Sequence, residues 1–432
     1  MSRQNAIESV LVLATFIFVN AANAIFQKPI TYNEGKGFDG MVYYQVAEFL
    51  SEGRPPRASA PFVYRIGTPA LVALLFKGNL LWGFKVVNIL ANALTTSLLV
   101  IWLRGYLRDW KIRLALVLLF LTQWHGPIRS VYYYPAYTDP WLFVFLLGGL
   151  ILIRQYQQQP SIVQLFSLAL MSLAGGVFRD ASLVVPAAFV ISNNPITPWD
   201  GIVSFAKRLR PVLFIPLVTG LAGIAVVRVF ASQDNDYSFA GTALAWIYAK
   251  SLPTYLLGCF GAFGPAIFLV IYNWRRTISF LLEREFMLVY LACGAIVAWV
   301  GGSDTERMMY WSMPVVYVLL GKVLEDRRVL LRSPLLVMVL VVSQSIAQRV
   351  FWPIPDFPGT ATSTWPILTP FGDNVPYLDL LSVQGNHIVE LTSLIQYLIL
   401  GSILLEWLRQ REKKLSPSDR LSSTSRWRST PA

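Results

Sequence analysis

Long apolar stretches recur along the whole chain, and short segments between them carry most of its charged residues. Hydrophobic residues make up 55% of the 432 residues and charged residues only 14%, which leaves too little polar sequence for a separate soluble domain. A helix that crosses a bilayer needs about 20 mainly apolar residues. We therefore predict an all-α polytopic membrane protein, with a single transmembrane domain over residues 1–410.

The apolar stretches predict about twelve transmembrane helices. The predicted spans are 7–26, 68–103, 112–124, 140–153, 161–178, 181–192, 211–230, 252–274, 286–301, 308–322, 333–350 and 388–408. The second of these is long enough for a short helix at 68–76 before a full span. Several others are shorter than a full crossing, so we expect half-spans or broken helices among them.

The positions of the basic residues predict the orientation of the chain. Alternating the sides of the spans from 7–26 onward places nearly all basic clusters in short loops on one side, which the positive-inside rule makes the cytoplasm. These clusters are Arg104, Arg108, Lys111 and Arg113; Arg154; Lys207, Arg208 and Arg210; Arg275, Arg276 and Arg284; and Lys322, Arg327, Arg328 and Arg332. Both termini are then cytoplasmic, and 411–432 is a basic tail expected to be disordered. The net charge of +12 is thus explained by topology, and nucleic acid is excluded as a partner.

Two long loops fall on the opposite, extracytoplasmic side, at 27–67 and 351–387. Ionisable side chains gather at the outer ends of the predicted spans. They are Asp39, Asp139, Asp180, Asp304, Glu306, Arg65, Arg179 and Arg307. Charges at membrane depth are costly and usually face a protein interior or a water-filled cavity. Several at one level therefore predict a shared cavity.

Each of these residues also has a structural interpretation. Asp39 begins a plausible amphipathic helix and could be its N-cap. Arg65 could extend to lipid headgroups, and Arg179 with Asp180 could form a local ion pair that closes a helical hairpin. The tyrosines within 132–137 are typical of an interfacial aromatic belt.

The chain has few residues suited to metal or nucleotide chemistry. His125 and His387 are its only histidines, and it contains no HExxH motif, Cys/His spacing or Walker-type loop. We therefore assign no metal ligands. His125 is kept as a candidate supporting residue, with a structural role as its alternative.

An external carboxylate and several arginines suit one kind of reaction. A lipid-phosphate sugar donor needs cations to stabilise the leaving phosphate, and the acceptor hydroxyl needs a base as it attacks the anomeric carbon. Because nucleotide sugars are not expected on the outer face, a polyprenyl-phosphate sugar is the natural donor.

Four segments carry a resemblance to a known family. The sequences FDGMVYYQVAEFL, FVYRIGTPAL, FRDASLVVPAAF and GGSDTERMMYWSMPVV resemble motifs of the bacterial multi-spanning GT-C glycosyltransferases. The resemblance implies a GT-C-like fold with a large first extracytoplasmic loop, a location in the bacterial inner membrane, and sugar transfer on the non-cytoplasmic face. In that superclass the first external loop carries the catalytic acid, which corresponds to Asp39.

On this basis we expect an inverting transfer with Asp39 as the general base. Arg65, Arg179 and Arg307 would bind the donor phosphate. Supporting roles fall to Asp180, Asp304, Glu48, His125 and Asp139. The acceptor could be a glycan, a lipid or a protein, and no cofactor is assigned. A divalent metal stays open, because the motif holds one clear acid where some members have two.

A twelve-span secondary transporter is the main alternative. The segment RGYLRDWKIR is similar to the inter-helix signature of major-facilitator carriers, with Gly105, Leu107, Asp109 and Arg113 in place. The signature has a basic residue and a glycine where this chain has Trp110 and Ile112. A carrier also has little use for two long external loops. A lipid or polysaccharide flippase or ligase is the remaining possibility.

Overall fold

The computed structural model describes residues 3–194, 210–302, 304–328, 331, 333–351, 353–354, 356 and 387–413. This part of the chain is mostly helical, and its only strands are two short ones, β1 (Arg57–Ala58) and β2 (Ser232–Gln233), which pair in parallel. The all-α class is thereby confirmed. Most of the predicted loop 351–387 and of the tail 411–432 lies outside the described residues.

Five helical stretches among the described residues are long and apolar enough to cross a membrane. They are α1 (Arg3–Phe26), α4 (Leu80–Arg104), α7 (Asp139–Gln158), Pro211–Phe230 with η3 (Pro211–Phe214) and α11 (Ile215–Phe230), and Leu252–Tyr272 with α13 (Leu252–Phe263), η4 (Gly264–Ala266) and α14 (Ile267–Tyr272). Shorter apolar helices accompany them: α8 (Ile162–Phe178), η2 (Asp180–Leu183) with α9 (Val184–Asn193), α12 (Phe239–Ala249), α16 (Glu285–Val300) and α19 (Pro334–Ala347). These helices support a membrane-embedded protein.

The remaining helices are short connectors or extend the bundle. They are α2 (Asp39–Ser51), η1 (Phe62–Tyr64), α3 (Gly67–Leu75), α5 (Trp110–Thr122), α6 (Pro127–Tyr133), α15 (Trp274–Leu282), α17 (Thr305–Tyr310), α18 (Met313–Asp326) and α21 (His387–Lys413). The predicted stretch 68–103 divides into α3 and α4 as expected. Asn79 makes the division, because its side chain accepts a hydrogen bond from the backbone N–H of Trp82 and caps α4.

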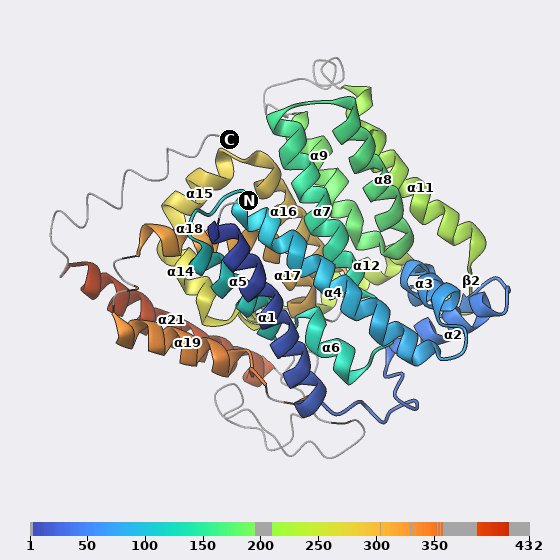
Figure 1. Cartoon of the computed structure of the whole chain (residues 1–432), viewed down its shortest axis with the longest axis horizontal. Helices are drawn as coiled ribbons and strands as arrows, with labels where there is room; N and C mark the ends of the chain where they lie inside the picture. Colours follow the sequence, from blue (N-terminus) through green and yellow to red (C-terminus); the bar gives the residue numbers. More distant parts are fainter. Residues whose placement is uncertain are drawn as a thin grey trace.

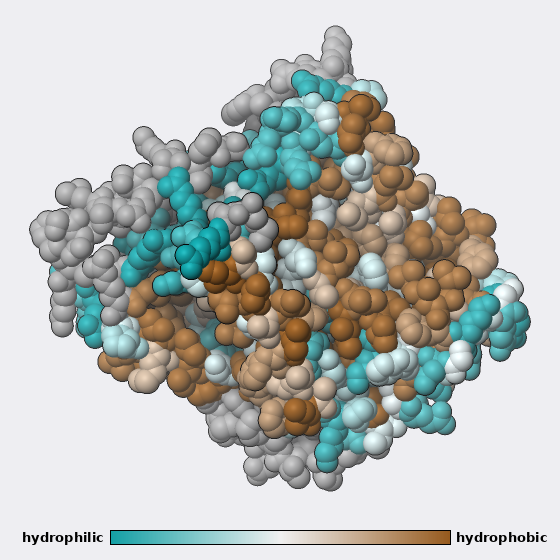
Figure 2. Space-filling model, viewed as in Figure 1, coloured by the Kyte–Doolittle hydropathy of each residue, from teal (hydrophilic) through white to brown (hydrophobic). Residues whose placement is uncertain are grey.

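Small residues allow the central helices to pack closely. A Cβ atom added at Gly176 would lie 2.3 Å from the carbonyl oxygen of Gly220, and one at Gly223 would lie 2.4 Å from that of Leu173, so α8 and α11 meet along their backbones. Helices α4, α7, α8 and α11 are neighbours in that order (Figure 1). The face in Figure 2 shows an apolar area between polar regions at two ends, as expected for a membrane-embedded bundle.

A buried ion-pair network joins α1 to α4 and α5 at the predicted cytoplasmic end. The carboxylate of Glu8, which is fully buried, accepts from Arg104 Nε at 2.9 Å and from Arg113 Nε at 2.6 Å. Nearby, Asp109 caps α5 and pairs with Arg328 at 2.9 Å. The acidic and basic residues of the carrier-like signature therefore hold helices together here.

The segment 27–67 is tied to distant parts of the chain. β1 pairs with β2, and Ser59 Oγ donates to Asp234 Oδ1 at 3.0 Å. At the start of the segment, the backbone N–H of Thr31 donates to Asp356 Oδ1 at 2.7 Å. These contacts fix the segment across the end of the bundle that carries α2 and α3 (Figure 1).

Substitution Glu8→Gln is expected to destabilise the fold, because it leaves two guanidinium groups without their carboxylate. Breaking a buried ion pair from one side typically costs about 3–5 kcal/mol. Thermal unfolding of the purified protein in detergent should show a clear loss of stability. The matched control is Glu34→Gln, whose carboxylate pairs with Lys36 but is 86% exposed. Equal melting temperatures for both variants would contradict this account of the network.

Candidate functional site

The structure brings seven of the predicted site residues together at the end of the bundle opposite the Glu8 network. We call this group the charged cluster. Its members are Asp39, Arg65, Asp139, Arg179, Asp180, Asp304 and Arg307. They come from α2, the end of η1, the start of α7, the turn after α8, η2 and α17. Helix ends that are distant in sequence thus build one polar site.

Asp139 is the centre of the charged cluster. It is 1% exposed, and its carboxylate forms ion pairs with Arg179 Nη1 and, at 3.7 Å, with Arg307 Nε. The hydroxyl of Tyr137 donates to Asp139 Oδ2 at 2.7 Å. One buried carboxylate therefore positions two arginines from different parts of the chain.

The two arginines have further contacts that restrict their orientation. Arg307 Nη2 pairs with Asp304 Oδ2 at 2.6 Å. The guanidinium carbon of Arg179 lies 5.0 Å from the ring centre of Trp311, a cation–π distance. Burial, Arg65 and Arg307 lower the pKa of Arg179 to about 9, although Tyr43 and Tyr137 oppose them. The local ion pair predicted between Arg179 and Asp180 does not form: Asp180 Oδ1 accepts instead from the backbone N–H of Ala181.

Asp39 is the acidic member that has no partner. It is the first residue of α2, and the N-cap is Phe38, so the N-cap interpretation of Asp39 is wrong. Within the described chain its carboxylate forms no hydrogen bond or ion pair, and it is half-buried. Its charge nevertheless acts on Arg65 and Arg307, so it lies within electrostatic range of both arginines.

Two glycines place Asp39 against the segment before α7. A Cβ atom at Gly40 would lie 2.6 Å from the carbonyl oxygen of Ala136. Gly37 has a φ of 75°, and a Cβ there would lie 2.8 Å from Tyr134. Only glycine permits both the backbone conformation and this close approach. The glycines that flank Asp39 in the sequence therefore have a positional role.

Arg65 is the cationic member that has no ion pair. Its Nη1 donates to the hydroxyl of Tyr43 on α2, and no carboxylate in the described residues pairs with it. Burial alone lowers the pKa of Arg65, but Tyr43, Asp180 and Asp39 outweigh burial and raise it. A Cβ at Gly67 would lie 2.3 Å from the ring of Phe178, so α3 meets the end of α8 and brings Arg65 beside Arg179.

The three arginines of the cluster each have a buried N–H group without a hydrogen bond among the described residues, although Arg307 Nε lies 3.7 Å from Asp139 Oδ2. The Nε atoms of Arg65, Arg179 and Arg307 are buried and have no hydrogen-bond acceptor in the described protein. Leaving such a donor unsatisfied costs about 1–3 kcal/mol. A bound anion with several oxygen atoms would supply the missing acceptors.

Two of the predicted supporting residues lie outside the charged cluster. Glu48 is nine residues beyond Asp39 on α2, which places it on the opposite face of that helix and about 13.5 Å along its axis. Its side chain is exposed. His125 lies in the turn between α5 and α6, where its pKa responds to Asp304 and Arg307 at the edge of the cluster.

Several contributing residues were not predicted from the sequence. Asn88 is buried on α4, and its Nδ2 donates to the carbonyl oxygens of Pro135 at 2.9 Å and Tyr137 at 2.7 Å, which holds the segment before Asp139. Tyr137 is 4% exposed, so it belongs to the site and not to an interfacial belt. A buried asparagine in an apolar span was the available signal for this role.

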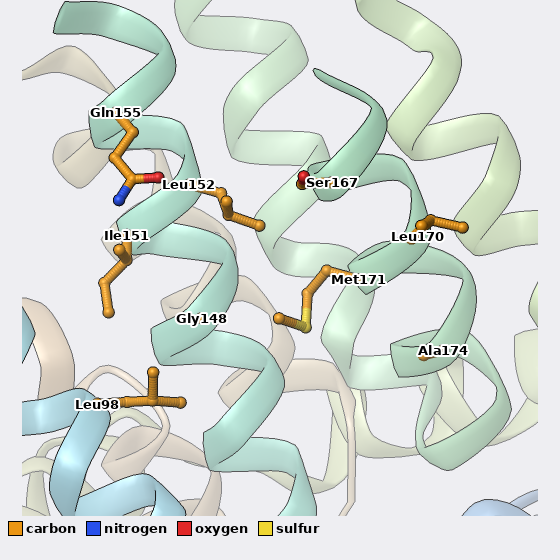
Figure 3. A pocket seen from close by; sticks show the side chains of 9 residues that line it. All are labelled: Leu98, Gly148, Ile151, Leu152, Gln155, Ser167, Leu170, Met171 and Ala174. Carbon is orange, nitrogen blue, oxygen red and sulfur yellow. The ribbon is translucent and has the colours of Figure 1, made fainter. Parts of the chain in front are cut away.

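An apolar groove lies between α4, α7 and α8 (Figure 3). Its volume is about 530 Å³, and it is lined by Leu98, Gly148, Ile151, Leu152, Gln155, Ser167, Leu170, Met171 and Ala174. Gly148 is nine residues beyond Asp139, so the groove begins about 13.5 Å along α7 from the charged cluster. The groove has no ionisable lining residue and is not the site of acid–base chemistry.

Comparisons with known proteins do not assign the chain to a family. No protein-family model matches it, and no curated protein matches it. Among the residues that the structure describes, no group of three or more His, Cys, Asp or Glu side chains could hold a metal ion. The site must therefore be interpreted from its own geometry.

The contacts predict a large loss of stability for the substitution of one aspartate and almost none for the other. Asp139→Asn is expected to lose about 3–5 kcal/mol, because it leaves Arg179 and Arg307 without their buried carboxylate. Asp39→Asn should change stability by no more than about 0.5 kcal/mol, because it removes no contact. Thermal unfolding in detergent measures both variants. A large loss for Asp39→Asn would show that this residue has a structural partner after all.

Proposed function

We propose that the protein is an integral membrane glycosyltransferase. It transfers a sugar from a polyprenyl-phosphate donor to an acceptor on the extracytoplasmic face of the membrane. The reaction is inverting, as in the GT-C glycosyltransferases that the sequence motifs resemble. Asp39 is the general base, and Arg65 is the principal ligand of the donor phosphate.

The observation that supports this proposal most strongly is that Asp39 and Arg65 both lack an ion pair in the described chain. Yet each lies beside the other charges of the cluster. Asp39 and Tyr43 lie one turn apart on α2, and Arg65 donates a hydrogen bond to the Tyr43 hydroxyl, so Arg65 is held against the helix that carries Asp39. A carboxylate and a guanidinium that influence each other and form no ion pair in the described chain suit a reaction that needs both a base and an anion-binding group.

The chemical step uses these groups as follows. The acceptor hydroxyl gives its proton to the Asp39 carboxylate while its oxygen forms a bond to the anomeric carbon. The bond between that carbon and the phosphate oxygen breaks, and its electron pair leaves with the polyprenyl phosphate. Arg65 stabilises the developing charge through hydrogen bonds, which are strong between guanidinium and phosphate. The Nε donors of Arg179 and Arg307, which have no hydrogen-bond acceptor in the described protein, would donate to the phosphate oxygens in the same cluster.

Asp139 has a positioning role in this proposal. It pairs with Arg179 and Arg307 and so fixes them before substrate binds. Preorganised charges stabilise a transition state without reorganising during the reaction. Asp304 orients Arg307 in the same way through its ion pair, and the charge of Asp180 acts on Arg65.

The proposal includes a topology. Twelve crossings of a bacterial inner membrane, with both termini cytoplasmic, place the charged cluster outside and the Glu8 network inside. This orientation agrees with the distribution of basic residues. The residues of the carrier-like signature have structural contacts here, because Asp109 caps α5 and pairs with Arg328, and Arg113 pairs with Glu8.

Asp39→Asn is expected to reduce sugar transfer by at least about 100-fold, the usual contribution of a general base. The assay measures transfer from a polyprenyl-phosphate sugar by the purified protein. Glu48→Gln is the matched control, because it removes a carboxylate from the opposite face of α2 and should keep full activity. Full activity of Asp39→Asn would overturn the catalytic assignment.

Arg65→Lys is expected to raise KM for the donor more than it lowers kcat, because lysine keeps the charge but loses the planar fork. Arg57→Lys, a substitution of an exposed residue in the same segment, is the control.

The transporter alternative has its own test. If wild-type protein in liposomes moves a soluble solute and transfers no lipid-linked sugar, the protein is a transporter and not a glycosyltransferase.

The topology predicts which side of the membrane each loop faces. A cysteine at Glu48 should react with a membrane-impermeant maleimide added outside intact cells, and a cysteine at Lys111 should react only after the membrane is opened. Both positions are exposed. The background should be low, because Cys259 and Cys293 are only partly exposed. Labelling of Lys111→Cys in intact cells would reverse the proposed orientation.

A further inference from the structure

A second group of buried basic side chains lies beside the charged cluster, where α6 meets the chain just after α19. Arg129 and Arg349 are 4% and 5% exposed. Their guanidinium carbons lie 4.7 Å and 4.1 Å from the ring centre of Trp124, which precedes α6. Arg129 Nη2 donates to the carbonyl oxygen of Arg349 at 2.7 Å. Two segments more than two hundred residues apart in sequence are thus joined around one tryptophan.

The charge of Arg129 is not compensated within the described part of the chain. No carboxylate there forms an ion pair with Arg129, and its Nη1 atom is buried with no hydrogen-bond acceptor. Burial and the neighbouring Arg349 lower the pKa of Arg129 to about 9, which still leaves it cationic at neutral pH. A buried, unpaired guanidinium is costly to maintain, so an anion bound here would stabilise the fold.

His125 connects this group to the charged cluster. Burial, Arg349, Arg307 and Arg129 lower its pKa to about 3, although Asp304 opposes them, so the imidazole is neutral at neutral pH. The residue therefore lies near enough to both the Arg129 group and Arg307 for their charges to act on it. Trp124 and His125 are both partly exposed, which provides access from outside.

We propose that Arg129, Arg349 and Trp124 form a second anion site that binds a terminal phosphate group, separate from the donor phosphate at Arg65. This inference rests on the proposed function for its biological source. A phosphomonoester carries a charge of about −1.5 to −2 at pH 7, which suits the unpaired guanidinium of Arg129 with a second cation, Arg349, beside it. The phosphodiester of a polyprenyl-phosphate sugar carries a single negative charge and suits Arg65. The terminal phosphate belongs either to a phosphorylated acceptor or to the polyprenyl monophosphate released by transfer.

Binding to the full-length protein in detergent tests the second site without any transfer reaction. The probes are inorganic phosphate and a labelled short-chain prenyl monophosphate. Prenyl monophosphate should bind wild-type protein and raise its melting temperature, and inorganic phosphate should do the same if the site recognises phosphate alone. Arg129→Gln should weaken this binding at least tenfold. Arg57→Gln, at an exposed arginine, should bind as wild type. Arg307→Gln should also retain most of the binding, which separates the second site from the charged cluster.

The two probes distinguish the sources of the phosphate. Equal stabilisation by both indicates a site that recognises phosphate alone, as a phosphorylated acceptor requires. Stabilisation by prenyl monophosphate only indicates a site for the released carrier. Unchanged binding of both probes by Arg129→Gln, or no binding by wild-type protein, would overturn the proposal. If Arg129→Gln does not fold, Arg129→Lys, which keeps the charge and loses the fork, should weaken binding partially.

These outcomes are independent of the proposed chemistry. Binding at Arg129 can fail while Asp39→Asn still abolishes transfer, which would leave the glycosyltransferase intact and remove only the second site. Conversely, an absence of sugar transfer by the wild-type protein together with phosphate binding at Arg129 would leave an anion site in a protein of another activity.

Discussion

The buried carboxylate of Asp139 is the interaction on which the charged cluster depends. It pairs with Arg179 at the end of α8 and with Arg307 on α17, and it is held by Tyr137 from the preceding segment. Each guanidinium group is costly to bury alone, so the shared carboxylate stabilises both of them in one place. The pairing therefore fixes the relative positions of three distant helix ends.

This scaffold leaves one carboxylate and one guanidinium of the cluster without an ion pair in the described chain. Asp39 and Arg65 lie at the edge of the paired groups, and close glycine contacts with Tyr134 and Phe178 hold their helices there. Paired residues give rigidity, and unpaired residues can meet a substrate. The proposed function uses this division: Asp139 positions, and Asp39 and Arg65 react and bind.

The helices and the candidate charged residues are predictable from the sequence, but the ion pairs between those residues are not. Apolar length and basic loops predict the helical bundle, including the division of 68–103 into α3 and α4. The cost of charge at membrane depth selects Asp39, Arg65, Arg179 and Arg307. The partner of Arg179 is Asp139, forty residues earlier, and only the packing of α7 against α8 reveals it. The group around Trp124 has no motif, because its arginines come from segments that meet only in the folded chain.

The central claim is that Asp39 and Arg65 face one substrate. The most direct measurement is an experimental structure of the protein with a bound, non-reactive polyprenyl-phosphate sugar analogue. The account predicts that the phosphate oxygens lie within about 3 Å of the Arg65 guanidinium and that the Asp39 carboxylate faces the anomeric carbon from the opposite side. A phosphate bound elsewhere, with Asp39 turned away from the sugar, would contradict it.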